Sequence, residues 1–222
     1  GKYGYTTATG AGLVTQADGS LKRNTVTSTH ESSLTGVTFN PNKQKLTFTY
    51  TLTDMTTAGW PVMGMFVKDD LGNMMRIAFV SAGDQLMLMA RDDYNSRMYF
   101  KSGDPWTPFG SKTNYYTFGK VVDNAAYKLT VKVVIDGYKV EMYVKTGNGT
   151  SWITIYGADS QYDVEERYNN GQCAIGGKGS AFTDTLFGLD RDCSFGVSAR
   201  CDVKDSNLGV FSNIWYTIED RV

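Results

Sequence analysis

The chain has 222 residues and a formal net charge of −1, with acidic and basic side chains in nearly equal number. No Lys/Arg cluster is present, which argues against nucleic acid and anionic membranes as partners. No apolar run approaches the roughly 20 residues of a membrane-spanning helix. The length suits one β-sandwich domain that buries a sizeable core without disulfide bonds. Because the sequence starts at Gly1 without an initiator Met, we interpret residues 1–222 as a single domain excised from a larger protein.

The first part of the chain is polar. Residues 1–24 are rich in Gly, Thr and Ala with one apolar pair, Leu13–Val14, so we predict an edge segment outside the core. His30, the only histidine, lies in the polar run STHESS, which is typical of a solvated loop. A Ser-His-Asp or Cys-His pair would have to be built around this one residue, and nothing near it favours that chemistry.

Period-two alternation predicts strands through the next third of the chain. In Lys45–Thr53, apolar residues fill one face and four threonines the other. A methionine-rich meander follows, with strands over Val62–Val67, Met74–Val80 and Gln85–Ala90 and turns of Asp, Gly, Asn and Ser between them. Methionine fills irregular gaps in cores, so we interpret these residues as core, with a Met-lined binding surface as the alternative.

The clearest element is the hairpin Tyr127–Val144, YKLTVKVVIDGYKVEMYV. Two alternating runs flank Asp136–Gly137, and this dipeptide supplies the positive φ angles of a tight turn. The hairpin has one apolar face, which requires a second layer to cover it. Strands are also predicted near Tyr115–Val122 and Trp152–Tyr156, while residues 159–169 fit a short helix or a loop equally well.

The segment Arg91–Tyr116 places aromatic rings beside charged groups. Aromatic rings stack on the apolar faces of sugar rings, and charged groups bind hydroxyls. The alternative is that Trp106 plugs one end of the sandwich. We predict a ligand site made of Trp60, Asp92, Tyr94, Arg97, Trp106, Tyr115 and Tyr116.

Oxygen ligands are dense near the end of the chain. Calcium prefers such ligands, although no EF-hand spacing is present. Solvated loop acids are the ordinary interpretation, and a structural calcium site is the alternative; no other cofactor is required. The candidate metal ligands are Asp190, Asp192, Asp202 and Asp205.

The three cysteines leave two arrangements open. No C-x-x-C pair is present, which argues against structural zinc. A straight strand would hold Cys193 and Cys201 about 26 Å apart, too far for a disulfide. Either Cys173 pairs with one of them or all three thiols are free.

Two closing runs carry a family resemblance. SFGVSAR (Ser194–Arg200) and GVFSNIWYTI (Gly209–Ile218), together with the hairpin and KLTFTYTLT, resemble concanavalin A-like, laminin-G-like jelly rolls. The resemblance implies an all-β, two-sheet antiparallel jelly-roll sandwich over about residues 34 to 220. It covers carbohydrate-binding modules, lectins, glycosidases and polysaccharide lyases, so it does not fix a function.

We therefore predict a non-catalytic, lectin-like module of a secreted or cell-surface protein, whose partners are oligo- or polysaccharides and other domains of the same polypeptide. The E-x-D-x-x-E pattern of glucanases is absent, and no catalytic residue is assigned. One alternative is an adhesin or spacer domain that binds protein or nothing. The other is a glycan-cleaving enzyme with a carboxylate pair about 5 to 9.5 Å apart, drawn from Asp69, Asp92, Asp104 and Glu141.

Overall fold

The computed structural model describes residues 5–8, 13–23, 30–34, 36–54, 62–71, 74–82, 85–92, 97–99, 107–108, 117–120, 128–137, 139–156, 191–200 and 209–222. The regular elements within these ranges are strands that pair antiparallel. None of the described segments forms a helix with the length and hydropathy needed to cross a membrane. The strands are β1 (Tyr5–Ala8), β2 (Leu13–Thr15), β3 (Leu21–Arg23), β4 (His30–Leu34), β5 (Gln44–Thr53), β6 (Val62–Asp69), β7 (Met74–Ala82), β8 (Gln85–Asp92), β9 (Arg97–Tyr99), β10 (Thr107–Pro108), β11 (Thr117–Lys120), β12 (Lys128–Asp136), β13 (Lys139–Thr146), β14 (Ile153–Tyr156), β15 (Cys193–Arg200) and β16 (Val210–Asp220).

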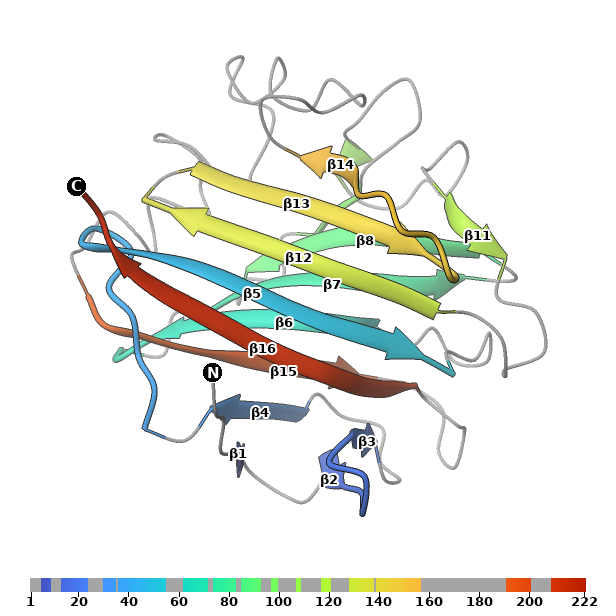
Figure 1. The fold of residues 1–222 in the computed structure, drawn as a ribbon, viewed down its shortest axis with the longest axis horizontal. Coiled ribbons are helices and arrows are strands. Elements are labelled where there is room, and N and C mark those ends of the chain that lie inside the picture. Colours follow the sequence, from blue (N-terminus) through green and yellow to red (C-terminus); the bar gives the residue numbers. More distant parts are fainter. Residues whose placement is uncertain are drawn as a thin grey trace.

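The strands form two sheets, which confirms the predicted all-β jelly-roll sandwich. The nine-stranded sheet has the order β1-β4-β15-β6-β7-β8-β9-β10, and β11 also pairs with β8. The seven-stranded sheet has the order β14-β13-β12-β5-β16-β3-β2. Figure 1 shows the seven-stranded sheet in front of the nine-stranded one, with the chain crossing repeatedly between them. Each sheet therefore has one face toward its partner and one face turned away.

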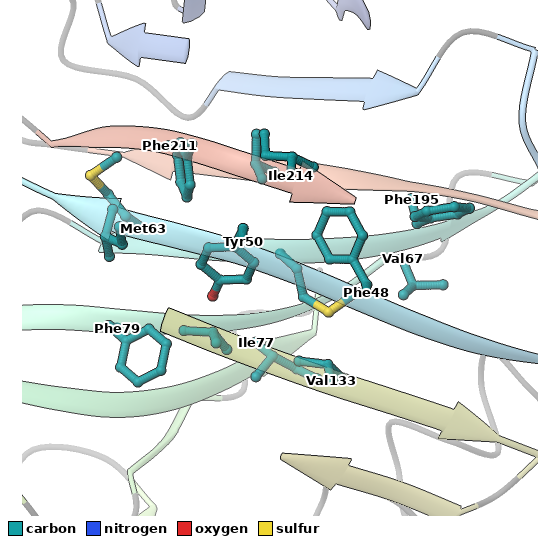
Figure 2. Close-up of a cluster of buried hydrophobic side chains, with 14 of the residues drawn as sticks. Phe48, Tyr50, Met63, Val67, Ile77, Phe79, Val133, Phe195, Phe211 and Ile214 are labelled. Atoms are coloured by element: carbon teal, nitrogen blue, oxygen red, sulfur yellow. The ribbon is translucent and has the colours of Figure 1, made fainter. Parts of the chain in front are cut away.

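Strict alternation builds the core between the sheets. In β12 every second side chain, from Leu129 to Ile135, is fully buried and the residues between them are partly exposed. Phe195 from the other sheet meets Phe48 edge-on, with ring centroids 5.6 Å apart, and makes the same kind of contact with Phe39. Figure 2 shows aromatic and aliphatic side chains of both sheets, among them Phe48, Val133 and Phe195, meeting between the two layers. Met63 and Met65 are fully buried, as the core interpretation predicts.

The predicted hairpin is confirmed, and its turn has a second role. Gly137 has φ +62°, so the Asp-Gly turn uses the left-handed conformation that glycine favours. A Cβ at Gly137 would also lie 2.7 Å from Nη1 of Arg221. Arg221 binds Asp136 through Nε at 2.7 Å and donates to the carbonyl of Asn42 at 3.1 Å. The glycine thus leaves room for a side chain that joins the turn to the last strand.

The break in alternation in the last strand is a β-bulge. Asn213 has φ +48°, and the pairing of β16 with β5 shifts between Ser212 and Trp215. One extra residue in a bulge reverses the phase of every side chain after it. Consequently Ile214 is buried in the core, whereas Trp215 is turned outward and is 40% exposed.

Two expectations about the first part of the chain are wrong. Leu13 and Leu21 are buried in the core cluster, because β2 and β3 extend the seven-stranded sheet and complete its inner face. The prediction of an edge segment is right for β2, which ends the sheet. The side chain of Leu13 on this strand nevertheless lies in the core. His30 starts β4, which pairs with both β1 and β15, and so does not lie in a loop. Polar residues form this strand because pairing on both sides satisfies the backbone.

Candidate functional site

Two of the seven residues predicted to bind sugar lie in the described part of the chain. Asp92 ends β8 and Arg97 starts β9, which are neighbouring strands of the nine-stranded sheet. Position 97 is opposite position 91, whereas position 92 shares a face with Ala90, which is opposite the buried Ile77. Asp92 and Arg97 therefore occupy opposite faces of the sheet at the level of the backbone. The other five lie outside the described residues: Trp60, Tyr94, Trp106, Tyr115 and Tyr116.

Register places three arginine positions in one row across the nine-stranded sheet. Arg76 on β7 is directly opposite Arg91 on β8, and Arg91 is directly opposite Arg97 on β9. Arg76 is in turn opposite Phe66 on β6, and Phe66 is opposite Gly196 on β15. We call Arg76, Arg91 and Arg97 the arginine row. All three are positions of the outer face, because they alternate with positions that pair with the core residues Ile77 and Met65.

The arginine row is energetically unusual. Like charges directly opposite each other on neighbouring strands destabilise a sheet, and this row repeats that pairing twice. Guanidinium groups are fixed forks of donors that bind carboxylate, sulfate or phosphate oxygens in pairs. The counter-charge for such a row can come from acidic side chains of the protein or from an anionic ligand.

Small side chains lie beside the arginine row. The next row of outer positions runs from Ser198 through Gly64 and Ala78 to Met89 and Tyr99. Ser198 and Ala78 are 4% and 2% exposed although they are on the outer face. A Cβ at Gly64 would overlap the carbonyl oxygen of Ile77, so β6 and β7 approach closely here. The outer face is covered here, and the burial extends to the end of the arginine row, where Phe66, opposite Arg76, is 1% exposed.

The sequence analysis missed Arg76 and Arg91. Each lies in an alternating run that predicts a strand, and neither is part of a local motif. Only the register of three strands brings them level with Arg97. A register argument from the meander turns would have been the one signal in the sequence able to find them.

The predicted calcium ligands are mostly beyond the described part of the chain. Asp190, Asp202 and Asp205 lie outside it, and Asp192 is exposed. Asn40 donates from Nδ2 to Asp192 at 3.4 Å. The described residues contain no group of three His, Cys, Asp or Glu side chains that could hold a metal ion. Calcium binding stays a prediction.

The carboxylates considered for catalysis are distributed over both sheets. Asp69 ends β6 in the nine-stranded sheet and accepts the backbone N–H of Leu71 at 3.0 Å. Glu141 lies on β13 in the seven-stranded sheet and accepts the Tyr143 hydroxyl at 2.8 Å. Since Asp69 and Glu141 come from different sheets, they do not form a pair beside one bond. Asp104 lies outside the described residues.

The described cysteine is not a nucleophile. The thiol of Cys193 is fully buried and donates toward the carbonyl of Arg191 at 3.6 Å. Burial, followed by the negative charges of Asp69, Asp192 and Asp70, raises the pKa of Cys193 to about 12. A reactive cysteine needs the opposite environment. Cys193 is free, and the two other cysteines lie outside the described residues.

Comparison with known proteins gives similarity of structure only. No protein-family model matches the sequence, and no curated protein matches it. Among solved structures, a functionally unknown protein from Saccharomyces cerevisiae is 12% identical with a TM-score of 0.46, covering 97% of this chain and 95% of that chain. The carbohydrate-binding module CBM66 from Bacillus subtilis is 13% identical with a TM-score of 0.44, covering 96% and 95%. Alginate lyase A1-II′ of polysaccharide lyase family 7 is 10% identical with a TM-score of 0.41, covering 96% and 85%. At these values the similarity is one of general strand arrangement.

Proposed function

We propose that the chain is a non-catalytic glycan-binding module of a secreted or cell-surface protein, and that it binds its ligand on the outer face of the nine-stranded sheet. The arginine row is the observation that carries this proposal. Three cations directly opposite one another on neighbouring strands destabilise the sheet unless a counter-charge is present. A ligand with regularly spaced carboxylate or sulfate groups supplies that counter-charge. The ligand class is therefore an acidic oligo- or polysaccharide.

Tyr99 supports the same surface. It follows Arg97 by two residues on β9 and so shares the outer face of that strand. Its position is opposite Met89, in the row beside the arginine row. An aromatic ring there would stack on a sugar whose acidic groups bind arginine. The predicted aromatic residues Tyr94, Trp106, Tyr115 and Tyr116 would extend this surface from the loops.

The proposal of binding without cleavage rests on Asp69 and Glu141, the two candidate carboxylates whose hydrogen bonds are described; Asp92 lies two strands from Asp69 on the same face of the nine-stranded sheet at the level of the backbone. Asp69 and Glu141 belong to different sheets, and each accepts a hydrogen bond from its own strand or turn. Hydrolysis of a glycosidic bond needs two carboxyl groups on either side of one bond. The adhesin alternative predicts a surface with every large aromatic buried, and Trp215 is exposed.

A glycan array with acidic and neutral members, run with calcium and with chelator, tests this proposal. We expect binding to acidic glycans that weakens as salt is added, because the contacts are between charges. Arg91→Gln with Arg97→Gln should weaken binding at least about tenfold, the equivalent of about 1.4 kcal/mol. Lys22→Gln with Lys43→Gln removes two charges elsewhere and is the control.

Two results would contradict the proposal. The absence of binding to any glycan in both conditions would contradict glycan binding and favour the adhesin or spacer function. Release of shortened products from a bound glycan, followed over time, would show an enzyme instead of a binding module. Loss of binding in chelator alone would keep the function and support the calcium prediction for the region of Asp190, Asp192, Asp202 and Asp205.

A further inference from the structure

The outer face of the seven-stranded sheet carries a second cluster of chemistry-bearing side chains, far from the arginine row because the whole sandwich lies between them. Nζ of Lys132 on β12 is 4.3 Å from the centre of the Tyr143 ring on β13. The same ammonium is 4.7 Å from the centre of the Trp152 ring. Nζ of Lys145 is 4.3 Å from that indole as well. Two cations thus share one aromatic ring.

These two cations are not neutralised by a described carboxylate. Neither Lys132 nor Lys145 forms an ion pair with an acidic side chain in the described part of the chain. Burial, followed by the charge of Lys145, lowers the pKa of Lys132, and Glu141 opposes this only in part. Glu141 accepts the Tyr143 hydroxyl at 2.8 Å, which orients both groups. Among the described side chains of this cluster, two ammonium groups lie beside the single carboxylate of Glu141, so an anion is the complementary ligand.

Register continues this cluster across the sheet to an exposed indole. Lys132 is opposite Thr49 on β5, and Thr49 is opposite Trp215 on β16. Thr49 is 4% exposed although it lies on the outer face, and its hydroxyl has no hydrogen-bond partner. Trp215 is 40% exposed because the bulge at Asn213 turns it outward. We call Lys132, Tyr143, Lys145, Trp152 and Trp215 the Lys–Trp strip.

We propose that the Lys–Trp strip is a second binding site, which takes an acidic oligosaccharide with a carboxylate or sulfate between Lys132 and Lys145 and a sugar ring on Trp215. The faces of Trp152 and Tyr143 already contact ammonium groups, whereas Trp215 has exposed area for stacking. Strands β12 and β16 are two spacings apart, about 10 Å. A ligand must therefore contain more than one sugar residue to contact both ends.

The choice of a glycan over an acidic peptide rests on the proposed function, which gives the ligand class. The location of the site rests on the exposed indole of Trp215 on the same sheet face as two lysines. Between Lys132 and Trp215 the outer positions of β5 are threonines: Thr49, which is 4% exposed, with Thr47 and Thr51 two residues away on either side. The hydroxyl of Thr49 is buried, so this position separates the two ends of the strip and offers the ligand no hydrogen bond. Two acidic-sugar sites on opposite faces would let one module join two chains of a polymer.

Titration calorimetry with oligogalacturonates tests the inference on the whole chain. The methyl esters of the same oligomers are the neutral match, since they keep the sugar and lose the charge. We expect two binding sites per chain in the unmodified protein and one in the variant Lys132→Gln with Lys145→Gln. Lys22→Gln with Lys43→Gln removes the same charge elsewhere and should keep both sites. Trp215→Ala should weaken the second site at least about tenfold while leaving the first unchanged.

The two proposals fail in different ways. If Arg91→Gln with Arg97→Gln abolishes all binding and the lysine variant changes nothing, the second site is wrong and the proposed function stands. If only the lysine variant loses binding, the Lys–Trp strip is a site and the arginine row is not. Equal binding of the methyl esters, or equal competition by polyglutamate, would overturn the assignment to an acidic glycan. Circular dichroism and thermal unfolding of each variant exclude misfolding as the cause.

Discussion

The two sheets are alike inside and different outside. Their inner faces are built from the same kinds of large apolar side chain, and both contribute to one core. The outer face of the seven-stranded sheet carries threonines, lysines and exposed indole. The outer face of the nine-stranded sheet carries Gly, Ala and Ser positions beside a row of arginines. Because alternation separates the two faces of a strand, one can specify the fold while the other is free to specify a ligand.

The largest expected effect comes from breaking the inner face. Phe48 is fully buried and meets both Tyr50 and Phe195. Phe48→Ala should lower the free energy of unfolding by about 3–5 kcal/mol, because it removes apolar contacts and leaves a cavity. Thr47→Ala changes the neighbouring outer position and should stay within about 0.5 kcal/mol. Urea unfolding measures both. Similar losses of unfolding free energy for the two variants would mean that the outer face contributes to stability as much as the inner face does.

A smaller loss is expected where the outer face of the nine-stranded sheet depends on having no side chain. Gly64→Ala places a Cβ where it overlaps the Ile77 carbonyl oxygen and lies 2.5 Å from the Ala78 Cα, both in the backbone of β7. Relief requires β6 and β7 to separate, at about 1–3 kcal/mol. Thermal unfolding at fixed pH gives the change. An unchanged midpoint would show that the two strands do not pack this closely.

The protein should become more stable when one inner side chain is made less polar. Tyr50 is fully buried between the sheets and its hydroxyl has no hydrogen-bond partner (Figure 2). Burial raises the pKa of this phenol, as expected for a hydroxyl far from water. Tyr50→Phe should raise the free energy of unfolding by about 1 kcal/mol. Chemical denaturation of the pair decides the sign, and a decrease would mean that a buried water binds the hydroxyl.

The smallest effect is a pH dependence of stability at Cys193, which is absent at neutral pH. Its pKa is raised from 9.0 to about 12, so the unfolded chain loses the thiol proton at lower pH than the folded one. The contribution of Cys193 to stability is therefore complete below pH 9 and is lost as pH rises toward 12. Cys193→Ala should show a shallower loss of stability across this interval. Parallel pH dependences in the two proteins would contradict the assignment.

The fold was predictable because it depends on local alternation. The hairpin Lys128–Thr146, the strand Gln44–Thr53 and the three meander strands all appear close to the residues that the pattern predicts. The prediction failed at Leu13, Leu21 and His30, where short strands gain their structure from the strands they pair with. Such strands have too few residues to show a period of their own.

The candidate site was much less predictable. Arg76, Arg91 and Arg97 become one feature only through the register of three strands. Lys132 and Tyr143 are opposite each other across the predicted hairpin, so that pair could have been found from the turn alone. Trp215 could not, because its direction depends on a bulge. The aromatic residues named from the loops between Arg91 and Tyr116 stay predictions.

The bulge at Asn213 also determines how this chain should be compared with relatives. A sequence alignment that closes a one-residue gap at this point would match Trp215 with inner positions and Tyr216 with outer ones. The final strand would then score as dissimilar although its backbone is the same. Matching the last strand to another chain therefore requires Val210–Ser212 and Ile214–Asp220 to be aligned as two separate blocks, joined by a single variable residue.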